Sequence, residues 1–203
     1  RDIKLGIIAG GQLGKMLIQA ASKWDITCYV LDKDVNCCCS SICKNFYCGD
    51  PDNFEDVYNF GKKVDILTYE IEHINIDALK KLKNEGLPIY PDPSILAIIQ
   101  DKGQQKTFFK DHDIPTANFK LYCNKEEILQ DIAYNKLIFP FVQKVRRGGY
   151  DGRAVVSVNK EEELPDLFDG PTVVERKIDI KKELSIIASR NPSGQIISFP
   201  AVE

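Results

Sequence analysis

The sequence predicts an α/β fold in two parts. In residues 1–92, short apolar runs alternate with glycine-containing turns and amphipathic stretches, a pattern typical of a doubly wound parallel sheet. The part from 93 to 203 is organised around 144–153, where three glycines between two β-prone runs predict a hairpin-like loop. Pro91 and Pro93 break the chain between the two parts, so we place a domain boundary there.

Hydrophobic periodicity defines the elements of the first part. Its apolar runs predict strands over 4–9, 26–31, 64–69 and 86–90. Its amphipathic stretches predict helices over 15–23, 54–61 and 76–82. Gly10, Gly11 and Gly14 fill the turn after the first strand and would let a phosphate sit at the N-terminus of the first helix.

A dinucleotide site of the Rossmann type is the alternative function that this turn suggests. Asp32, at the end of the second strand, would suit a ribose hydroxyl. The glycine fingerprint is incomplete, however, because Ala9 occupies its first position, and acidic residues end many second strands. A nicotinamide-dependent oxidoreductase built on the first part therefore has weak support, and cofactor absorbance would test it.

Acidic residues follow the third predicted strand. Glu70 and Glu72 lie at its carboxyl end, where ligands bind in open α/β sheets, and they would point the same way in an extended segment. The alternative, about equally supported, is an acidic pair at a helix N-terminus. His73 and His112 have no companion at metal-ligand spacing, so we expect surface or helix-end positions for both.

The second part begins with a helix that we expect to run from Ser94 to about Phe109, with Lys102 and Lys106 on one face. Further patterns predict strands over 138–145, 154–158 and 172–178, helices over 126–133 and 161–168, and a hairpin formed by 184–189 and 195–200.

The glycine-rich loop has the chemistry of a phosphate site. Four cationic side chains crowd into it: Lys144, Arg146, Arg147 and Arg153. Without a Cβ at the glycines, backbone N–H groups can approach an anion closely. Tyr150 and Asp151 at the tip could orient or deprotonate a second, smaller substrate. A solvated basic turn is the alternative that composition alone leaves open.

The composition argues against several classes of partner. The 203 residues include 27 Lys and Arg against 30 Asp and Glu, so a net charge of −3 favours neither nucleic acid nor an anionic membrane. No apolar run has the length of a membrane span, and no signal-peptide pattern is present. The seven cysteines lack zinc-site spacing, so we expect reduced thiols at small-residue positions of a cytoplasmic protein.

An ordered series of motifs carries a family resemblance. It consists of G-G-Q-L-G-K-M at 10–16, T-Y-E-I-E-H-I at 68–74, I-I-Q-D-K at 98–102, P-F-V-Q-K at 140–144, R-G-G-Y-D-G-R at 147–153, V-V-E at 173–175 and E-L-S-I-I at 183–187. Together these motifs resemble the ATP-grasp superfamily, and within it the 5-(carboxyamino)imidazole ribonucleotide synthases. The match covers essentially the whole chain, and G-G-Y-D-G-R is its most family-specific piece.

The resemblance implies an ATP-dependent carbon–nitrogen ligase of purine biosynthesis. ATP would phosphorylate bicarbonate, and the carboxyphosphate so formed would carboxylate the exocyclic amine of 5-aminoimidazole ribonucleotide. Because a mixed anhydride must be kept from water, a mobile lid is expected over about 115–175. Residues 1–92 would form the pre-ATP-grasp domain, 93–203 the ATP-grasp domain, and 176–203 the start of its C-terminal subdomain. The family also implies Mg²⁺, a homodimer, and a mutase that receives the product.

The resemblance assigns site residues as well. Bicarbonate and the amine would be surrounded by the catalytic residues Tyr150, Asp151 and Arg153, with Arg153 stabilising the developing oxyanion. The ribonucleotide would contact Gln12, Leu13 and Glu70. ATP would contact Lys102, Lys144, Gly149, Tyr150, Asp151, Gly152, Arg153, Glu175, Arg176, Lys177, Ile178, Glu183 and Glu203. In this set the lysines would hold phosphates, 175–178 would read the adenine by its backbone, and Glu183 would accept from ribose hydroxyls. Glu175 as a strand-end surface acid and Glu183 as a hairpin charge are the alternatives.

Three departures from the family pattern matter. Lys102 stands where an arginine is usual, so a bidentate grip on phosphate would be lost. Ala154 and Val155 stand where Gly-Gln is usual, which removes a flexible residue from the phosphate loop. The acidic segment that binds magnesium in the family, ending in an Asn-Glu pair, does not occur in the 203 residues. We therefore expect a truncated chain without metal ligands of its own, and measurable ATP-dependent phosphate release from these residues would contradict that.

Two further functions remain as alternatives. A related ATP-grasp ligase would transfer formate to glycinamide ribonucleotide, but it predicts a serine- and glycine-rich loop in place of 149–152. A non-catalytic nucleotide-binding protein would keep the fold without the metal ligands.

Overall fold

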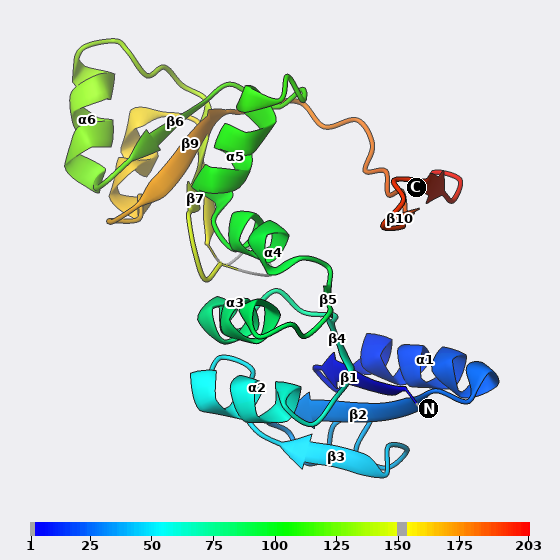
Figure 1. Ribbon diagram of the computed structural model, residues 1–203. Helices are drawn as coiled ribbons and strands as arrows, with labels where there is room; N and C mark the ends of the chain where they lie inside the picture. Colours follow the sequence, from blue (N-terminus) through cyan, green and yellow to red (C-terminus); the bar gives the residue numbers. More distant parts are fainter. Residues whose placement is uncertain (1–2, 150–153) are drawn as a thin grey trace.

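Residues 3–149 and 154–203 are described by the computed structural model, which arranges them as two α/β units (Figure 1). The first unit contains a five-stranded sheet in the order β3-β2-β1-β4-β5, with every neighbouring pair parallel. Its strands are β1 (Lys4–Ile8), β2 (Thr27–Asp32), β3 (Asn45–Cys48), β4 (Ile66–Tyr69) and β5 (Ile89–Tyr90). The doubly wound parallel sheet predicted from the sequence is confirmed.

Helices pack on both faces of this sheet because successive strand residues face opposite sides. Helix α1 (Gln12–Ala21) packs on the face that carries Ile7. Helices α2 (Phe54–Gly61) and α3 (Ile76–Asn84) pack on the face that carries Ile8. A short 3₁₀ turn, η1 (Ser22–Trp24), extends α1 towards β2.

Several cysteines pack on the α1 side of the parallel sheet. All seven have free thiols, and those of Cys28, Cys39 and Cys43 are buried in the core beneath α1. Burial raises the pKa of Cys39 to about 11, so its thiol stays protonated at neutral pH. The backbone N–H of Cys39 donates to the Gly10 carbonyl at 3.0 Å, which fixes the cysteine-rich segment against the turn between β1 and α1.

The second unit is built on an antiparallel four-stranded sheet in the order β6-β9-β7-β8. Its strands are β6 (Phe119–Tyr122), β7 (Phe141–Val145), β8 (Val155–Val158) and β9 (Thr172–Arg176). Helix α6 (Lys125–Ala133) and the 3₁₀ helix η2 (Glu161–Asp166) pack on the face that carries Phe141 and Val174. The predicted hairpin around the glycine-rich loop is confirmed, because β7 and β8 pair from Phe141–Val158 to Lys144–Val155.

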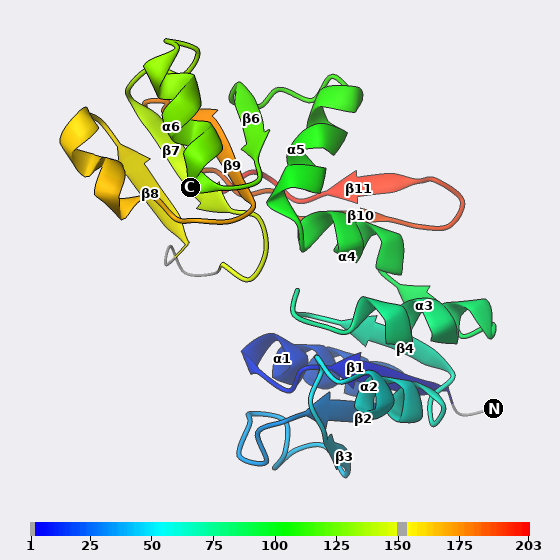
Figure 2. The ribbon, with the colours of Figure 1, turned by 90° about the vertical axis from the view of Figure 1, so that its left-hand side faces the viewer.

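Two helices connect the units. Helix α4 (Pro93–Ile99) and helix α5 (Lys102–Asp111) follow β5. In both views α4 lies between the two units, and α5 lies beside the four-stranded sheet (Figure 1, Figure 2). The single helix predicted from Ser94 to about Phe109 was wrong. The chain leaves the helical conformation at Asp101, where φ is −123° and ψ is 104°, and the Asp101 carboxylate then caps α5.

Other departures from the sequence prediction are smaller. Strands β3 and β6 were not predicted, because each has only 4 residues and mixes polar with apolar side chains. The acidic stretch after β8 forms a 3₁₀ helix that contains Pro165, in place of the predicted α-helix. His112 ends α5 as its C-cap, and its ring stacks on Phe108 with centroids 4.1 Å apart.

The C-terminal segment extends away from both units in Figure 1. Every residue from Arg176 to Glu203 is exposed. The segment contains the predicted hairpin, with β10 (Ala188–Arg190) antiparallel to β11 (Ile196–Ser198). Across the described ranges, no helix has the length and apolar character needed to cross a lipid bilayer.

Substitution of Gly14 tests the close packing of α1 on the β1 turn. A Cβ at this position would lie 2.6 Å from the carbonyl oxygen of Ala9, a backbone atom that cannot turn aside. We therefore expect Gly14→Ala to lower the free energy of unfolding by about 1–3 kcal/mol, measured by urea denaturation. Gln19→Ala, at an exposed position of the same helix, is the control and should leave stability unchanged or slightly higher. Equal stability of the two variants would contradict this packing.

Candidate nucleotide and substrate site

The Asp101 carboxylate ties the glycine-rich loop to helix α5. Asp101 is only 2% exposed, and it accepts hydrogen bonds from the backbone N–H groups of Gly103 and Gln104 in the first turn of α5. The Arg146 guanidinium donates to both of its oxygens at 2.8 Å, and Arg147 Nε donates to Oδ2 at 3.2 Å. Burial by itself would raise the pKa of Asp101, but the bonds from Arg146, the Gln104 amide and Arg147 outweigh it and lower the pKa to about 2.

Lys102 follows Asp101 in the chain and contacts the glycine-rich loop directly. Its backbone N–H donates to the Arg146 carbonyl at 2.9 Å, and its Nζ donates to the Gly149 carbonyl at 3.1 Å. Gly103 is required in the same place, because a Cβ there would lie 2.5 Å from Arg146 Nε. The predicted phosphate residues Lys102 and Gly149 are therefore adjacent in the structure.

A buried carboxylate lies beside the loop stem. Glu175 on β9 is 6% exposed and forms ion pairs with Lys144 on β7 and with Lys106 on α5. Lys106 Nζ lies 2.5 Å from Oε2, and Lys144 Nζ contacts Oε1. Burial opposes ionisation, but the two ammonium groups, Lys106 first, lower the pKa of Glu175 below its usual value. The alternative of a strand-end surface acid was wrong for Glu175.

A cavity of about 490 Å³ separates the loop stem from the first unit. Glu72 and His73, which follow β4, line one wall, while Lys102, Arg147 and Gly149 line another. The cavity brings the carboxyl end of β4 opposite the glycine-rich loop. His73 is exposed, as expected from the sequence, and it also lines this cavity between the two units.

The residues assigned to the ribonucleotide lie around the N-terminus of α1. Gln12 and Leu13 are exposed in its first turn, and Leu13 is 58% exposed. The Glu70 carboxylate accepts hydrogen bonds from the backbone N–H groups of Gly14 and Gly11. Burial raises the pKa of Glu70, and these two bonds oppose that rise. Glu70 thus occupies the position at the helix N-terminus where we expected a phosphate.

Asp32 is engaged in the same turn. Its Oδ2 accepts from the Gly10 N–H at 2.6 Å, and its Oδ1 accepts from the Asp34 N–H at 2.8 Å. A carboxylate that stabilises its own turn has less capacity to bind a ribose, and Glu70 adds a second negative charge. These contacts weigh against the dinucleotide alternative.

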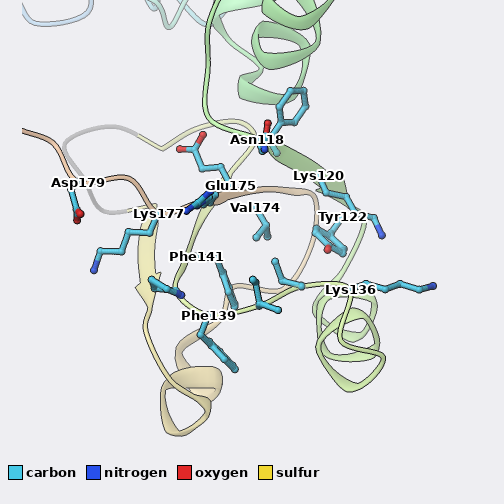
Figure 3. A pocket seen from close by; sticks show the side chains of 15 residues that line it. Asn118, Lys120, Tyr122, Lys136, Phe139, Phe141, Val174, Glu175, Lys177 and Asp179 are labelled. Atoms are coloured by element: carbon cyan, nitrogen blue, oxygen red, sulfur yellow. The ribbon is translucent and has the colours of Figure 1, made fainter.

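The hinge assigned to adenine follows Glu175 directly. Two of its N–H groups donate within the second unit, from Arg176 to the Asn118 carbonyl at 3.0 Å and from Lys177 to the Pro140 carbonyl at 3.4 Å. An adenine edge would therefore be read by the carbonyls or by the Ile178 amide. Figure 3 shows the neighbouring cavity of about 770 Å³, with Phe139, Phe141 and Tyr122 around it.

The other assigned residues are not brought to this cluster. Glu183 and Glu203 are exposed in the C-terminal segment, where Glu203 pairs with Lys182 at 2.8 Å. Tyr150, Asp151, Gly152 and Arg153 lie outside the described residues. The sequence analysis counted Arg146 among the cations of the phosphate loop, but it assigned neither Asp101 nor Lys106 to the site. A signal for Lys106 was present, since it follows Lys102 by one helical turn.

Two family models match the chain. The ribonucleotide synthetase pre-ATP-grasp domain matches residues 3–100, and the ATP-grasp domain matches residues 107–203. The chain belongs to the ATP-grasp superfamily. This confirms the resemblance that the ordered motifs carry in the sequence.

Several named proteins are similar to this chain in sequence or in structure. The chloroplastic phosphoribosylaminoimidazole carboxylase of Vigna aconitifolia is 36% identical over 208 residues, covering 100% of this chain and 37% of the relative. The structure of N5-carboxyaminoimidazole synthetase from Staphylococcus aureus, complexed with ADP, has 33% identity and a TM-score of 0.87, covering 98% of this chain and 54% of that one. The Aspergillus clavatus synthase in complex with ADP and 5-aminoimidazole ribonucleotide has 27% identity and a TM-score of 0.85, covering 98% and 53%. The ATP-grasp chain therefore spans about half, or less, of each relative.

Neutralisation of Asp101 tests the contacts that hold the glycine-rich loop to helix α5. Asp101→Asn removes the charge that pairs with Arg146 and weakens the cap of α5, so we expect a loss of about 2 kcal/mol in the free energy of unfolding. Because the folded pKa is lowered to about 2, the wild-type contribution is present above pH 4 and is lost as the pH falls towards 2. Urea denaturation at several pH values measures both effects.

Asp111→Asn at the other end of α5 is the matched control. Asp111 is exposed near the negative end of the helix dipole, so its neutralisation should not destabilise the protein. A difference between Asp101→Asn and wild type that stayed constant from pH 7 to pH 2 would contradict the role given to the carboxylate.

Proposed function

We propose that the protein to which this chain belongs is an ATP-dependent carbon–nitrogen ligase that carboxylates 5-aminoimidazole ribonucleotide with bicarbonate. The proposal depends on one observation. Lys102, Arg147 and Gly149 line the same cavity as the residues at the carboxyl end of β4. Similarity to N5-carboxyaminoimidazole ribonucleotide synthases over nearly the whole chain supports the choice of substrates.

The reaction proceeds in two steps. A bicarbonate oxygen attacks the γ-phosphorus of ATP, the bond to the ADP oxygen breaks, and carboxyphosphate forms. The exocyclic amine of the ribonucleotide then attacks the carboxyl carbon, phosphate leaves, and the amine loses a proton. Because bicarbonate is a poor electrophile and carboxyphosphate hydrolyses readily, the protein must supply phosphate-binding charge and exclude water.

The chain's own side chains suit this task. Lys144 and Lys102 would hold the nucleotide phosphates as point charges. The loop residues Tyr150, Asp151 and Arg153 would surround bicarbonate and the amine, and Arg153 would stabilise the oxyanion. Gln12, Leu13 and Glu70 would orient the ribonucleotide on the first unit. Glu183 and Glu203 would join the ATP site only if the C-terminal segment lies against the four-stranded sheet.

ATP fits the described residues better than its metal does. Lys144 is 32% exposed at its side chain, so nucleotide phosphates can reach it by competing with Glu175. Mg²⁺ accompanies ATP in ligases of this kind. Among residues 3–149 and 154–203, no group of three or more His, Cys, Asp or Glu side chains could hold a metal ion. We therefore assign no residue of this chain to the metal and draw no step through it.

The wider setting is also a proposal. We place the boundary between the pre-ATP-grasp and ATP-grasp domains near residue 92, with a lid over about 115–175. We infer a cytoplasmic homodimer that passes its product to a carboxyaminoimidazole ribonucleotide mutase.

An assay of the intact protein tests the substrates. ADP release with ATP and bicarbonate should increase on adding 5-aminoimidazole ribonucleotide, because its amine consumes carboxyphosphate. Glycinamide ribonucleotide with formate is the matched control and should give no increase. Stimulation by the control pair alone would overturn the proposal in favour of formate transfer.

Removal of the Lys144 charge tests the phosphate site. Lys144→Met should weaken ATP binding by about 10- to 100-fold, because a charge-assisted contact contributes about 1.5–3 kcal/mol. Isothermal titration of the intact protein with ATP measures the change. Lys160→Met, at a side chain that is 66% exposed, is the control and should bind ATP like wild type. Similar affinities for the two variants would contradict the assignment of Lys144.

A further inference from the structure

Glu175 carries two cations, although one is enough to balance its charge. Lys106 reaches its Oε2 from helix α5, and Lys144 reaches its Oε1 from strand β7. Phe119, the residue paired with Glu175 on the neighbouring strand β6, is apolar. Within the described residues, the charged groups that face Glu175 are therefore these two lysines. Glu175 and the two lysines together have a net charge of +1, so one ammonium group can bind another anion.

The two lysines differ in how far they are enclosed. The Lys106 side chain is 15% exposed, and its Nζ also donates to Thr116 Oγ1 at 2.6 Å. The Lys144 side chain is 32% exposed and stands at the start of the glycine-rich loop. A ligand that enters from the loop side can therefore recruit Lys144, while Lys106 stays between α5 and the segment before β6.

Recruitment of Lys144 would change the surroundings of Glu175. Its carboxylate is buried, and Oε2 receives no well-directed hydrogen bond from the described residues, only the ion-pair contact of Lys106. If Lys144 left and Lys106 were absent, a buried carboxylate would have no counter-charge. Such a state is unfavourable unless the carboxylate takes up a proton. Lys106 removes that obstacle because it keeps Glu175 paired after Lys144 has moved.

We propose that Lys106 is a positioning residue for nucleotide binding, which holds Glu175 charged and in place while Lys144 transfers to the nucleotide phosphates. This inference rests on the proposed function, because it takes a nucleotide as the anion. It assigns to Lys106 a role that acts through Glu175 and involves no contact with the nucleotide.

Titration of the intact protein with ADP from pH 6 to pH 8.5 tests the inference. Lys106→Met should weaken ADP binding about tenfold at pH 8.5, and the defect should shrink as the pH falls, because protonation of Glu175 replaces the lost counter-charge. Relative to wild type, the variant should also take up additional protons on binding ADP, measured by calorimetry in buffers of different ionisation enthalpy. Lys106→Arg should restore near-wild-type binding. Lys110→Met, at an exposed position one turn further along α5, is the control and should behave like wild type.

A double variant separates action through Glu175 from direct contact. In a Glu175→Gln background there is no buried charge to keep paired, so adding Lys106→Met should weaken ADP binding no further. An additional loss would overturn the inference, as would a Lys106→Met defect of equal size at every pH. If Lys106→Met alone does not fold, the comparison of Glu175→Gln with the double variant still tests whether Lys106 acts through Glu175.

Failure of the inference can be told apart from failure of the proposed function. If the wild-type protein binds neither ADP nor ATP, the proposed function is wrong. If wild type binds ADP and Lys106→Met matches Lys110→Met at every pH, only the role of Lys106 is wrong.

Discussion

The contact between Asp101 and Arg146 is the constraint on which the candidate site depends. One buried carboxylate caps helix α5 and binds the guanidinium at the end of strand β7. The helix start and the loop stem are thereby held at a fixed distance, and Lys102 is placed against Gly149. The chain leaves the helical conformation at the same residue, between α4 and α5, and α5 then packs against β9, where Lys106 pairs with Glu175. Geometry at the loop is thus set by a residue that needs no contact with a ligand.

Carboxylates also organise the turn after β1. Asp32 binds the Gly10 amide, and Glu70 binds the amides of Gly11 and Gly14 at the start of α1. The helix N-terminus therefore already has a negative partner from the protein. A Rossmann protein leaves those amides for the pyrophosphate of its cofactor. The same strand-turn-helix pattern is here better suited to contacts from exposed side chains such as Gln12.

The sequence was sufficient for the elements with strong periodicity or clear caps. Helices α2 and α3 begin at Phe54 and Ile76, as the periodicity predicted, and Asn53 and Asn75 cap them. The pairing of β7 with β8 followed from the glycines between them. The break at Asp101 was not predicted, because an aspartate within an apolar-periodic run is read as a surface residue until its partners are known. Those partners lie 45 and 46 positions away in the chain, at Arg146 and Arg147. For the same reason, Lys106 was placed on one helix face with Lys102 but was given no partner.

Nine apolar side chains between Ile178 and Val202 are each at least 58% exposed: Ile178, Ile180, Leu184, Ile186, Ile187, Ile196, Ile197, Phe199 and Val202. A two-stranded ribbon has little stability of its own, and a surface of this kind attracts other apolar surfaces. The net charge of −3 provides only weak repulsion between copies of the chain. We therefore expect these nine side chains to govern the colloidal behaviour of the 203 residues in water, because at high concentration the chains will adhere through them unless another surface covers them.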